Sequence, residues 1–205
     1  PSLFSLPPPS PPPPRPPWAG APNPPRRDTM ARHAGAYLVV VEGSVPTGAD
    51  GAFSTIAGQT NLAMLAETVA GAAAVLAVGS CSSFGGIASA SPNPTGARSV
   101  GELMAAGLVP ERPLVNLPGC PPMPLALAGT LAYRLAFGAL PPLDDKKRPL
   151  AFYGATVHEG CYRYHFFVEG KFAESPDDEG ACNGWCLYKL GCRGPITHNA
   201  CARFK

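Results

Sequence analysis

Thiol and imidazole side chains gather near the end of this sequence, in positions that could bind metal. Five of the seven cysteines lie in the last 45 residues, and His158 stands three places before Cys161 in the segment HEGCYRYHFF. Cys186 and Cys192 follow together in the segment CLYKLGC. Thiolate and imidazole are typical ligands of zinc and of iron-sulfur clusters. The pattern therefore predicts a metal or cluster site in this part of the chain.

The cysteine pattern leaves two alternatives open, disulfide bonds and a structural zinc ion. Disulfides are typical of secreted scaffolds, but the cysteine count of seven is odd and no export signal is evident. Zinc could bind the same histidine and three cysteines, although neither the His-x2-Cys pair nor the Cys-x5-Cys pair has the spacing of ordinary zinc fingers. An iron-sulfur cluster is favoured, because clusters account both for these cysteines and for Cys81 and Cys120, which one zinc site would leave unexplained. The aromatic residues among the cysteines would keep water away.

Upstream of this region, short apolar runs alternate with amphipathic segments. Runs that are apolar at every position predict strands buried on both faces, and Ser99 and Glu102 have the spacing of a capping box at a helix start. The expected strands are residues 37–41, 73–78 and a third within 113–120, and the expected helices are residues 61–71, 99–107 and 124–137. This order predicts an α/β fold, a parallel sheet with helices on both faces.

Two further cysteines each follow one of these expected strands. Cys81 comes just after the second strand and Cys120 just after the third, and the carboxyl ends of parallel strands meet at one edge of a sheet. We therefore expect both thiols at one rim, where Gly79 and Gly119 let backbone amides approach a bulky group. Burial of each cysteine as a small apolar residue is the alternative. Glu42 should reach the same edge, as a proton relay or as a carboxylate that closes a turn.

Composition divides the chain into three parts and excludes some functions. Residues 1–30 are expected to be a proline-rich disordered tail, since 13 of the 27 prolines precede residue 28. Residues 31–145 are expected to form the α/β domain and residues 146–205 an irregular cysteine-rich domain. A net charge of +2 without a basic stripe gives no indication of nucleic-acid binding. The longest apolar stretch is far shorter than the roughly 20 residues of a membrane span, so membrane contact is expected only through a partner.

Six segments, taken together, resemble the small, electron-transferring subunit of nickel-iron hydrogenases. In chain order they are VEGSVPTGADG, AVGSCSSFGG, PNPTGA, NLPGCPPMP, VHEGCYR and GWCLYKLGCRGPITHNAC, and the resemblance extends from about Tyr37 to the last residue. It implies a flavodoxin-like domain followed by an iron-sulfur domain. It also implies a proximal 4Fe-4S cluster, a medial 3Fe-4S cluster and a distal 4Fe-4S cluster with one histidine ligand, while the nickel-iron centre belongs to the large subunit.

The resemblance assigns a cluster to each matching position of this sequence. Cys81 and Cys120 match two proximal ligands, His158, Cys161, Cys186 and Cys192 match the distal set, and Cys201 matches the first medial ligand. The family's other proximal ligands, a Cys-x2-Cys on its first strand, and its two later medial ligands have no counterpart here. A partial sequence is therefore expected, without the first strand and incomplete at its C-terminus. Cys182 has no counterpart either, and we expect it to be a free thiol.

The function implied by the resemblance is an electron relay. Electrons would pass through the clusters between the hydrogenase large subunit and an external carrier such as a cytochrome or ferredoxin, during hydrogen oxidation or evolution. No residue of this chain is expected to perform acid-base or nucleophilic catalysis. One alternative is the cluster subunit of a complex I-like quinone reductase, which shares the GCPP turn but has no place for the block from His158 to Cys201. The other is a truncated, non-catalytic metal-binding module.

Three remaining features receive narrower expectations. Gly86 stands where some oxygen-tolerant relatives carry an extra cysteine, which favours the standard, oxygen-sensitive type. His165 and His198 have no cysteine at ligand spacing, so surface or hydrogen-bonding roles are expected for them. Members of the family are periplasmic, membrane-associated or cytoplasmic, so the sequence does not predict a compartment.

Overall fold

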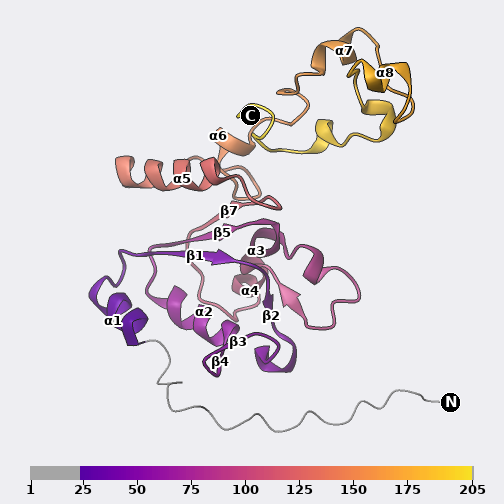
Figure 1. The fold of residues 1–205 in the computed structure, drawn as a ribbon. Helices are drawn as coiled ribbons and strands as arrows, with labels where there is room; N and C mark the ends of the chain where they lie inside the picture. Colours follow the sequence, from indigo (N-terminus) through magenta and orange to yellow (C-terminus); the bar gives the residue numbers. More distant parts are fainter. Residues whose placement is uncertain (1–23, 205) are drawn as a thin grey trace, which may run out of the picture.

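A three-stranded parallel sheet forms the centre of the fold in the computed structural model, which describes residues 24–204 (Figure 1). Its strands are β1 (Leu38–Glu42), β5 (Ala74–Val78) and β7 (Leu114–Leu117), in the order β1-β5-β7. Every residue of the central strand β5 is buried, because strands flank it on both edges and side chains cover both of its faces. The predicted parallel sheet is confirmed.

Helices cover both faces of this sheet, as the apolar runs predicted. Val75 of β5 packs with Val69 of α2 (Asn61–Ala70) and Leu103 of α4 (Val100–Ala105) on one face. On the other face, Leu76 packs with Ala126 of α5 (Pro124–Phe137) and with Tyr153 of α6 (Leu150–Tyr153). Successive residues of β5 thus serve opposite hydrophobic cores, which is the consequence of side-chain alternation along a strand.

Side-chain hydrogen bonds fix the first residues of helices α2 and α4. Thr60 precedes α2 and its Oγ1 accepts from the backbone amide of Ala63 at 3.2 Å. The predicted capping box of α4 is present, since Ser99 Oγ accepts from the Glu102 amide at 3.3 Å and Glu102 Oε2 accepts from the Ser99 amide at 2.7 Å. The hydrogen bond from the Ser99 amide lowers the pKa of the Glu102 carboxyl. Side-chain oxygens at these positions satisfy amides that the helix itself leaves unpaired.

Several short elements around the sheet were not anticipated. The strand β2 (Val45–Pro46) pairs antiparallel with β6 (Ala97–Arg98), and β3 (Thr55–Ile56) pairs antiparallel with β4 (Gln59–Thr60). A one-turn helix, α3 (Ser80–Phe84), follows β5 directly. The 3-10 helices are η1 (Gly48–Gly51), η2 (Ile87–Ser89), η3 (Tyr188–Leu190) and η4 (Gly194–Ile196). Two-residue strands carry too little sequence pattern to be predicted.

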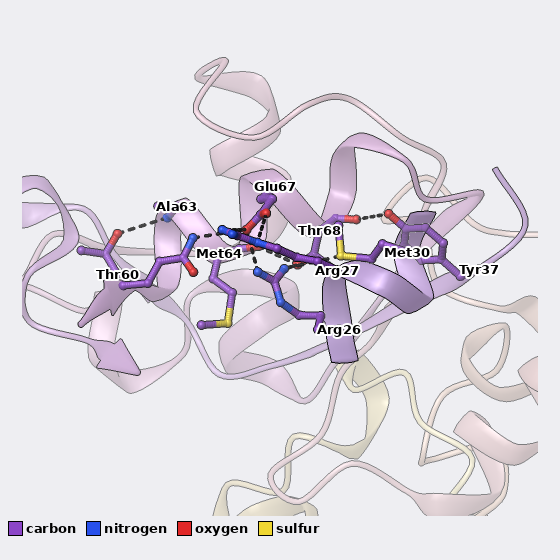
Figure 2. A network of polar contacts seen from close by, with 10 residues as sticks. Arg26, Arg27, Met30, Tyr37, Thr60, Ala63, Met64, Glu67 and Thr68 are labelled. Atoms are coloured by element: carbon purple, nitrogen blue, oxygen red, sulfur yellow. Dashed lines mark hydrogen bonds and ion pairs between the residues drawn. The ribbon is translucent and has the colours of Figure 1, made fainter. Parts of the chain in front are cut away.

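An N-terminal helix docks on α2, where the structure differs from the expected tail. Residues Pro24–Arg32 form α1, while residues 1–23 lie outside the described residues. Arg26 Nη2 contacts Glu67 Oε2 at 2.6 Å, and Arg27 Nε contacts Glu67 Oε1 at 2.7 Å (Figure 2). Arg26 also donates to the hydroxyl of Thr68. Residues 24–30 are therefore held by ion pairs to a carboxylate on α2 instead of belonging to a disordered tail.

Regular structure fades after α6, as expected. The chain continues through two short helices, α7 (Tyr164–Val168) and α8 (Glu179–Cys182), joined by turns. This part lies beyond α5 and α6 in Figure 1, away from the sheet, and the last residues return toward α6. The return is fixed by Val157, whose amide donates to the Thr197 carbonyl at 2.7 Å, and by His198 Nδ1, which donates to the Tyr153 carbonyl at 3.1 Å. His198 thus has the predicted hydrogen-bonding role.

Candidate functional site

The four side chains of the proposed distal set line a single cavity. His158, Cys161, Cys186 and Cys192 all border this cavity, whose volume is about 240 Å³. One water molecule takes about 30 Å³ of liquid volume, so the cavity has room for a group much larger than a single ion. Cys182, at the end of α8, is exposed and is not among the lining residues.

Backbone hydrogen bonds hold the segments that carry these four side chains. The His158 amide donates to the carbonyl of Gly194 at 3.1 Å, and the Cys161 amide donates to the carbonyl of His158 at 3.1 Å. Cys186 is held from the other side, since its amide donates to the Lys171 carbonyl at 3.1 Å. The positions of the ligand side chains therefore depend on turns that contact one another directly, with little regular secondary structure.

Backbone amides also point at two of the sulfur atoms. The Arg163 amide lies 3.4 Å from Cys161 Sγ, and the Gly194 amide lies 3.3 Å from Cys192 Sγ. Such bonds stabilise negative charge on a thiolate, and hydrogen bonds to sulfur help to set the reduction potential of an iron-sulfur cluster. The sequence analysis did not identify either residue as part of the site. The one signal in the sequence is that each lies two positions after a ligand cysteine, where a turn can direct the backbone amide toward the cysteine sulfur.

The guanidinium of Arg163 joins two sides of the cavity. Its Nη1 donates to the Trp185 carbonyl at 2.6 Å, one residue before Cys186, and its Nε donates to the Tyr162 hydroxyl at 2.8 Å. Arg163 itself borders the cavity. A fixed positive charge at this place would attract the negative charge of a thiolate-bound cluster.

The cavity and the chemistry of its donors suit a group with several metal atoms. Among residues 24–204, no three histidine, cysteine or acidic side chains are close enough to one another to hold one metal ion. A structural zinc ion needs four donors at about 2.0–2.3 Å from one centre. An iron-sulfur cluster has several iron atoms, each with its own protein ligand, so its donors can stand farther apart around a larger cavity. The donor set and its amides fit a cluster. All seven cysteines, each within the described residues, are free thiols.

The structure brings the segments of Cys81 and Cys120 together at the carboxyl edge of the sheet. Cys81 lies in the first turn of α3 and Cys120 follows β7, where its side chain is exposed. The residues just before them are bonded twice: the Ser80 amide donates to the Gly119 carbonyl at 2.9 Å, and the Gly119 amide donates to Ser80 Oγ at 3.1 Å. Two thiols supply half of the ligands of a four-cysteine cluster.

Position 86 requires a glycine, because the backbone there lies against Cys81. Its φ of +64° favours glycine, and a Cβ at this position would lie 2.6 Å from Cys81 Sγ.

Cys201 lies in an exposed turn near the end of the chain, where its amide donates to Asn199 Oδ1 at 3.2 Å. Glu42 ends β1 with an exposed side chain. In the part of the chain that the structure describes, no helix combines the length and hydrophobicity that a bilayer crossing requires.

Comparison with known proteins relates both halves of the chain to redox subunits. Residues 16–134 match the family model described as NADH ubiquinone oxidoreductase, 20 Kd subunit. Residues 153–205 match the model for the C-terminal region of the NiFe/NiFeSe hydrogenase small subunit. A chain of the [NiFeSe] hydrogenase from Desulfovibrio vulgaris Hildenborough is 33% identical, with a TM-score of 0.77 over 87% of this chain and 67% of that chain. The chain belongs to the family of nickel-iron hydrogenase small subunits.

Curated members of this family are similar over most of the chain. The uptake hydrogenase small subunit of Azotobacter vinelandii is 42% identical over 175 residues, which is 85% of this chain and 48% of that protein. The hydrogenase-2 small chain of Escherichia coli K12 is 41% identical over 177 residues, or 86% of this chain and 46% of that protein. The chain thus spans about half the length of the curated relatives that it matches. The similarity includes the cysteine-rich region, so the family assignment favours hydrogenase over the quinone reductase alternative.

Proposed function

We propose that this chain relays electrons in a nickel-iron hydrogenase, between the nickel-iron centre of a large subunit and an external electron carrier. The observation that carries the proposal is the cavity lined by one imidazole and three thiols, two of which receive backbone amides. These groups are the ligands and the hydrogen-bond donors that a 4Fe-4S cluster uses. The chain would contribute no group to acid-base or nucleophilic chemistry on hydrogen.

The residues around the cavity have distinct roles in this proposal. His158, Cys161, Cys186 and Cys192 would hold a distal 4Fe-4S cluster, which when bound accepts and releases one electron at a time. The amides of Arg163 and Gly194 donate to ligand sulfur, so they stabilise the negative charge that reduction adds. Because these donors are fixed by the backbone, they need little reorganisation when the charge changes.

Three further cysteines would belong to the other two clusters of the family. Cys81 and Cys120 would bind a proximal 4Fe-4S cluster, and Cys201 would bind a medial 3Fe-4S cluster. The exposed thiol of Cys120 at the sheet edge is compatible with a cluster that faces a large subunit. Similarity to a protein named uptake hydrogenase small subunit supports hydrogen oxidation as the direction. The external carrier in this proposal would be a cytochrome or ferredoxin.

Anaerobic reconstitution with iron and sulfide tests this proposal. The protein should bind about four irons and four sulfides at the distal site and show a paramagnetic signal on reduction. Cys192→Ser should remove that signal, because Cys192 lines the cavity. Cys182→Ser is the matched control and should leave it unchanged, since Cys182 is an exposed cysteine of the same region. One tightly bound zinc ion without sulfide would overturn the proposal.

A further inference from the structure

Aromatic rings surround the imidazole of His158. A histidine ligand commonly donates its second ring N–H to a carboxylate, carbonyl or water, and this bond fixes the ring. Within residues 24–204, the contacts of the His158 ring are aromatic, and no protein group there is hydrogen-bonded to either ring nitrogen. These aromatic contacts can set the direction of the ring.

Two aromatic rings contact this imidazole at steep angles. The ring centroids of His158 and Phe167 are 4.6 Å apart with an interplanar angle of 86°. Tyr164 makes a second contact of the same kind, with centroids 5.0 Å apart and an angle of 72°. Edge-to-face packing at these distances is attractive and directional, because a ring edge is positive and a ring face is negative. Rotation of the imidazole would lose both contacts.

Phe167 is itself held by a larger aromatic cluster. Its ring packs against Phe172 at 5.9 Å and against Tyr188 at 5.5 Å, both at steep angles. Phe167 also lies on α7, and the Tyr164 amide just inside that helix donates to the Cys161 carbonyl at 3.0 Å. The ring that contacts the imidazole is therefore tied both to the aromatic cluster and to the turn of the neighbouring ligand cysteine.

We propose that Phe167, assisted by Tyr164, is a positioning residue that orients the His158 imidazole toward the cavity by edge-to-face packing. The proposal rests on the distal cluster of the proposed function and assigns a role to an aromatic ring that is not a ligand of that cluster. Its consequence is that removal of the Phe167 ring lets the imidazole rotate. Iron bound by His158 is then lost more readily, although all four ligands remain in the chain.

Matched variants on the same helix test the role of Phe167 in the complete hydrogenase. Phe167→Leu removes the ring, Phe167→Tyr keeps it, and Phe166→Leu removes a neighbouring ring that packs on His165 instead. The measurements are the ¹⁵N-histidine coupling of the reduced distal cluster by pulsed electron paramagnetic resonance and the rate of iron release to a chelator. Phe167→Leu should weaken the coupling and release iron about tenfold faster, which is the lower end of the usual effect of a residue that orients a metal ligand.

Control variants should separate positioning from general packing. Phe167→Tyr and Phe166→Leu should match the original protein in both measurements. Tyr164→Leu should change both in the same direction as Phe167→Leu but less; this ring is half exposed, so its loss does not endanger folding. Unchanged coupling and iron release in Phe167→Leu would overturn the proposal, as would equal effects of Phe166→Leu and Phe167→Leu. Absence of histidine coupling in the original protein would instead refute the distal site itself.

Discussion

Replacement of Asp144 by asparagine should destabilise the junction between the sheet and the cysteine-rich region. Asp144 Oδ2 contacts Arg148 Nε at 2.7 Å, and the side chains of the two residues are only 13% and 11% exposed. Asp144 Oδ1 also accepts from the amides of Lys146 at 3.0 Å and Arg148 at 2.8 Å. The turn closed by these bonds connects to the sheet through Asn116, whose Nδ2 donates to the Lys146 carbonyl at 2.9 Å.

The size of the effect follows from the burial of this ion pair. Asparagine retains an acceptor for the two amides but presents an amide donor to Arg148 Nε, which leaves the buried guanidinium without a counter-charge. Loss of one partner from a buried pair costs about 3–5 kcal/mol, and the residual exposure here favours the lower end, about 3 kcal/mol. At about 2–4 °C per kcal/mol for a chain of this size, the melting temperature should fall by about 6–12 °C.

The pH dependence gives an independent check on the same pair. Burial alone would raise the pKa of the Asp144 carboxyl, but hydrogen bonds from the Arg148 amide and guanidinium outweigh burial and lower it. Stability from the pair is therefore fully present above the ordinary aspartate pKa of about 3.9 and is lost as the pH falls through the lowered value. Asp144→Asn should lack this acid loss.

Calorimetric unfolding between pH 7 and pH 2 measures both effects. Asp145→Asn is the matched control, because Asp145 is exposed in the same turn, and it should change the melting temperature by less than about 2 °C. The reasoning fails if Asp144→Asn unfolds within about 2 °C of the original protein at pH 7, or if the two asparagine variants behave alike.

Three further substitutions have defined outcomes. Hydrogen bonding to Arg26 is the main cause that lowers the pKa of Glu67 to about 2, so Glu67→Gln should loosen α1 by about 1 kcal/mol at neutral pH. The protection of the amides of residues 26–32 against hydrogen exchange, relative to their intrinsic rates, measures this and should also fall in the original protein between pH 4.5 and pH 2. Gly86→Ala would place a Cβ 2.6 Å from Cys81 Sγ, so it should displace the thiol and change its alkylation rate, read by mass spectrometry. Gly180→Ala would place a Cβ 2.9 Å from the Phe172 carbonyl oxygen, so it should lower the melting temperature.

Local pattern in the sequence was sufficient for the sheet and its main helices. The continuous apolar run of β5 predicted a strand buried on both faces, and the spacing of Ser99 and Glu102 predicted the start of α4. These predictions succeeded because the apolar run and the capping box are each complete within one short segment of the sequence. The grouping of His158 with three cysteines followed from spacing and from the resemblance, and the structure places all four around one cavity.

Contacts between distant residues explain what the sequence did not reveal. Helix α1 depends on Glu67, which is 41 positions away from Arg26, so composition alone suggested a tail. The amides of Arg163 and Gly194 act through the backbone, so their side-chain identity gives little indication of the role. The packing of Phe167 against His158 likewise depends on how α7 turns back after Cys161. The α1 contact requires a three-dimensional path of the chain that no single segment encodes, whereas the other two features depend on how local turns direct amides and rings.

Because turns make up most of the cysteine-rich region, its folding depends on whether an inorganic group is bound in its cavity. The first domain is held by a three-stranded sheet. Among the described residues, the cysteine-rich region has only isolated β-bridges, such as the one between Phe172 and Cys186. Since the unfolded chain offers no preformed site, the free energy of binding an inorganic group adds directly to the stability of the folded region. Chelation should therefore melt residues 158–194 first and leave the sheet intact.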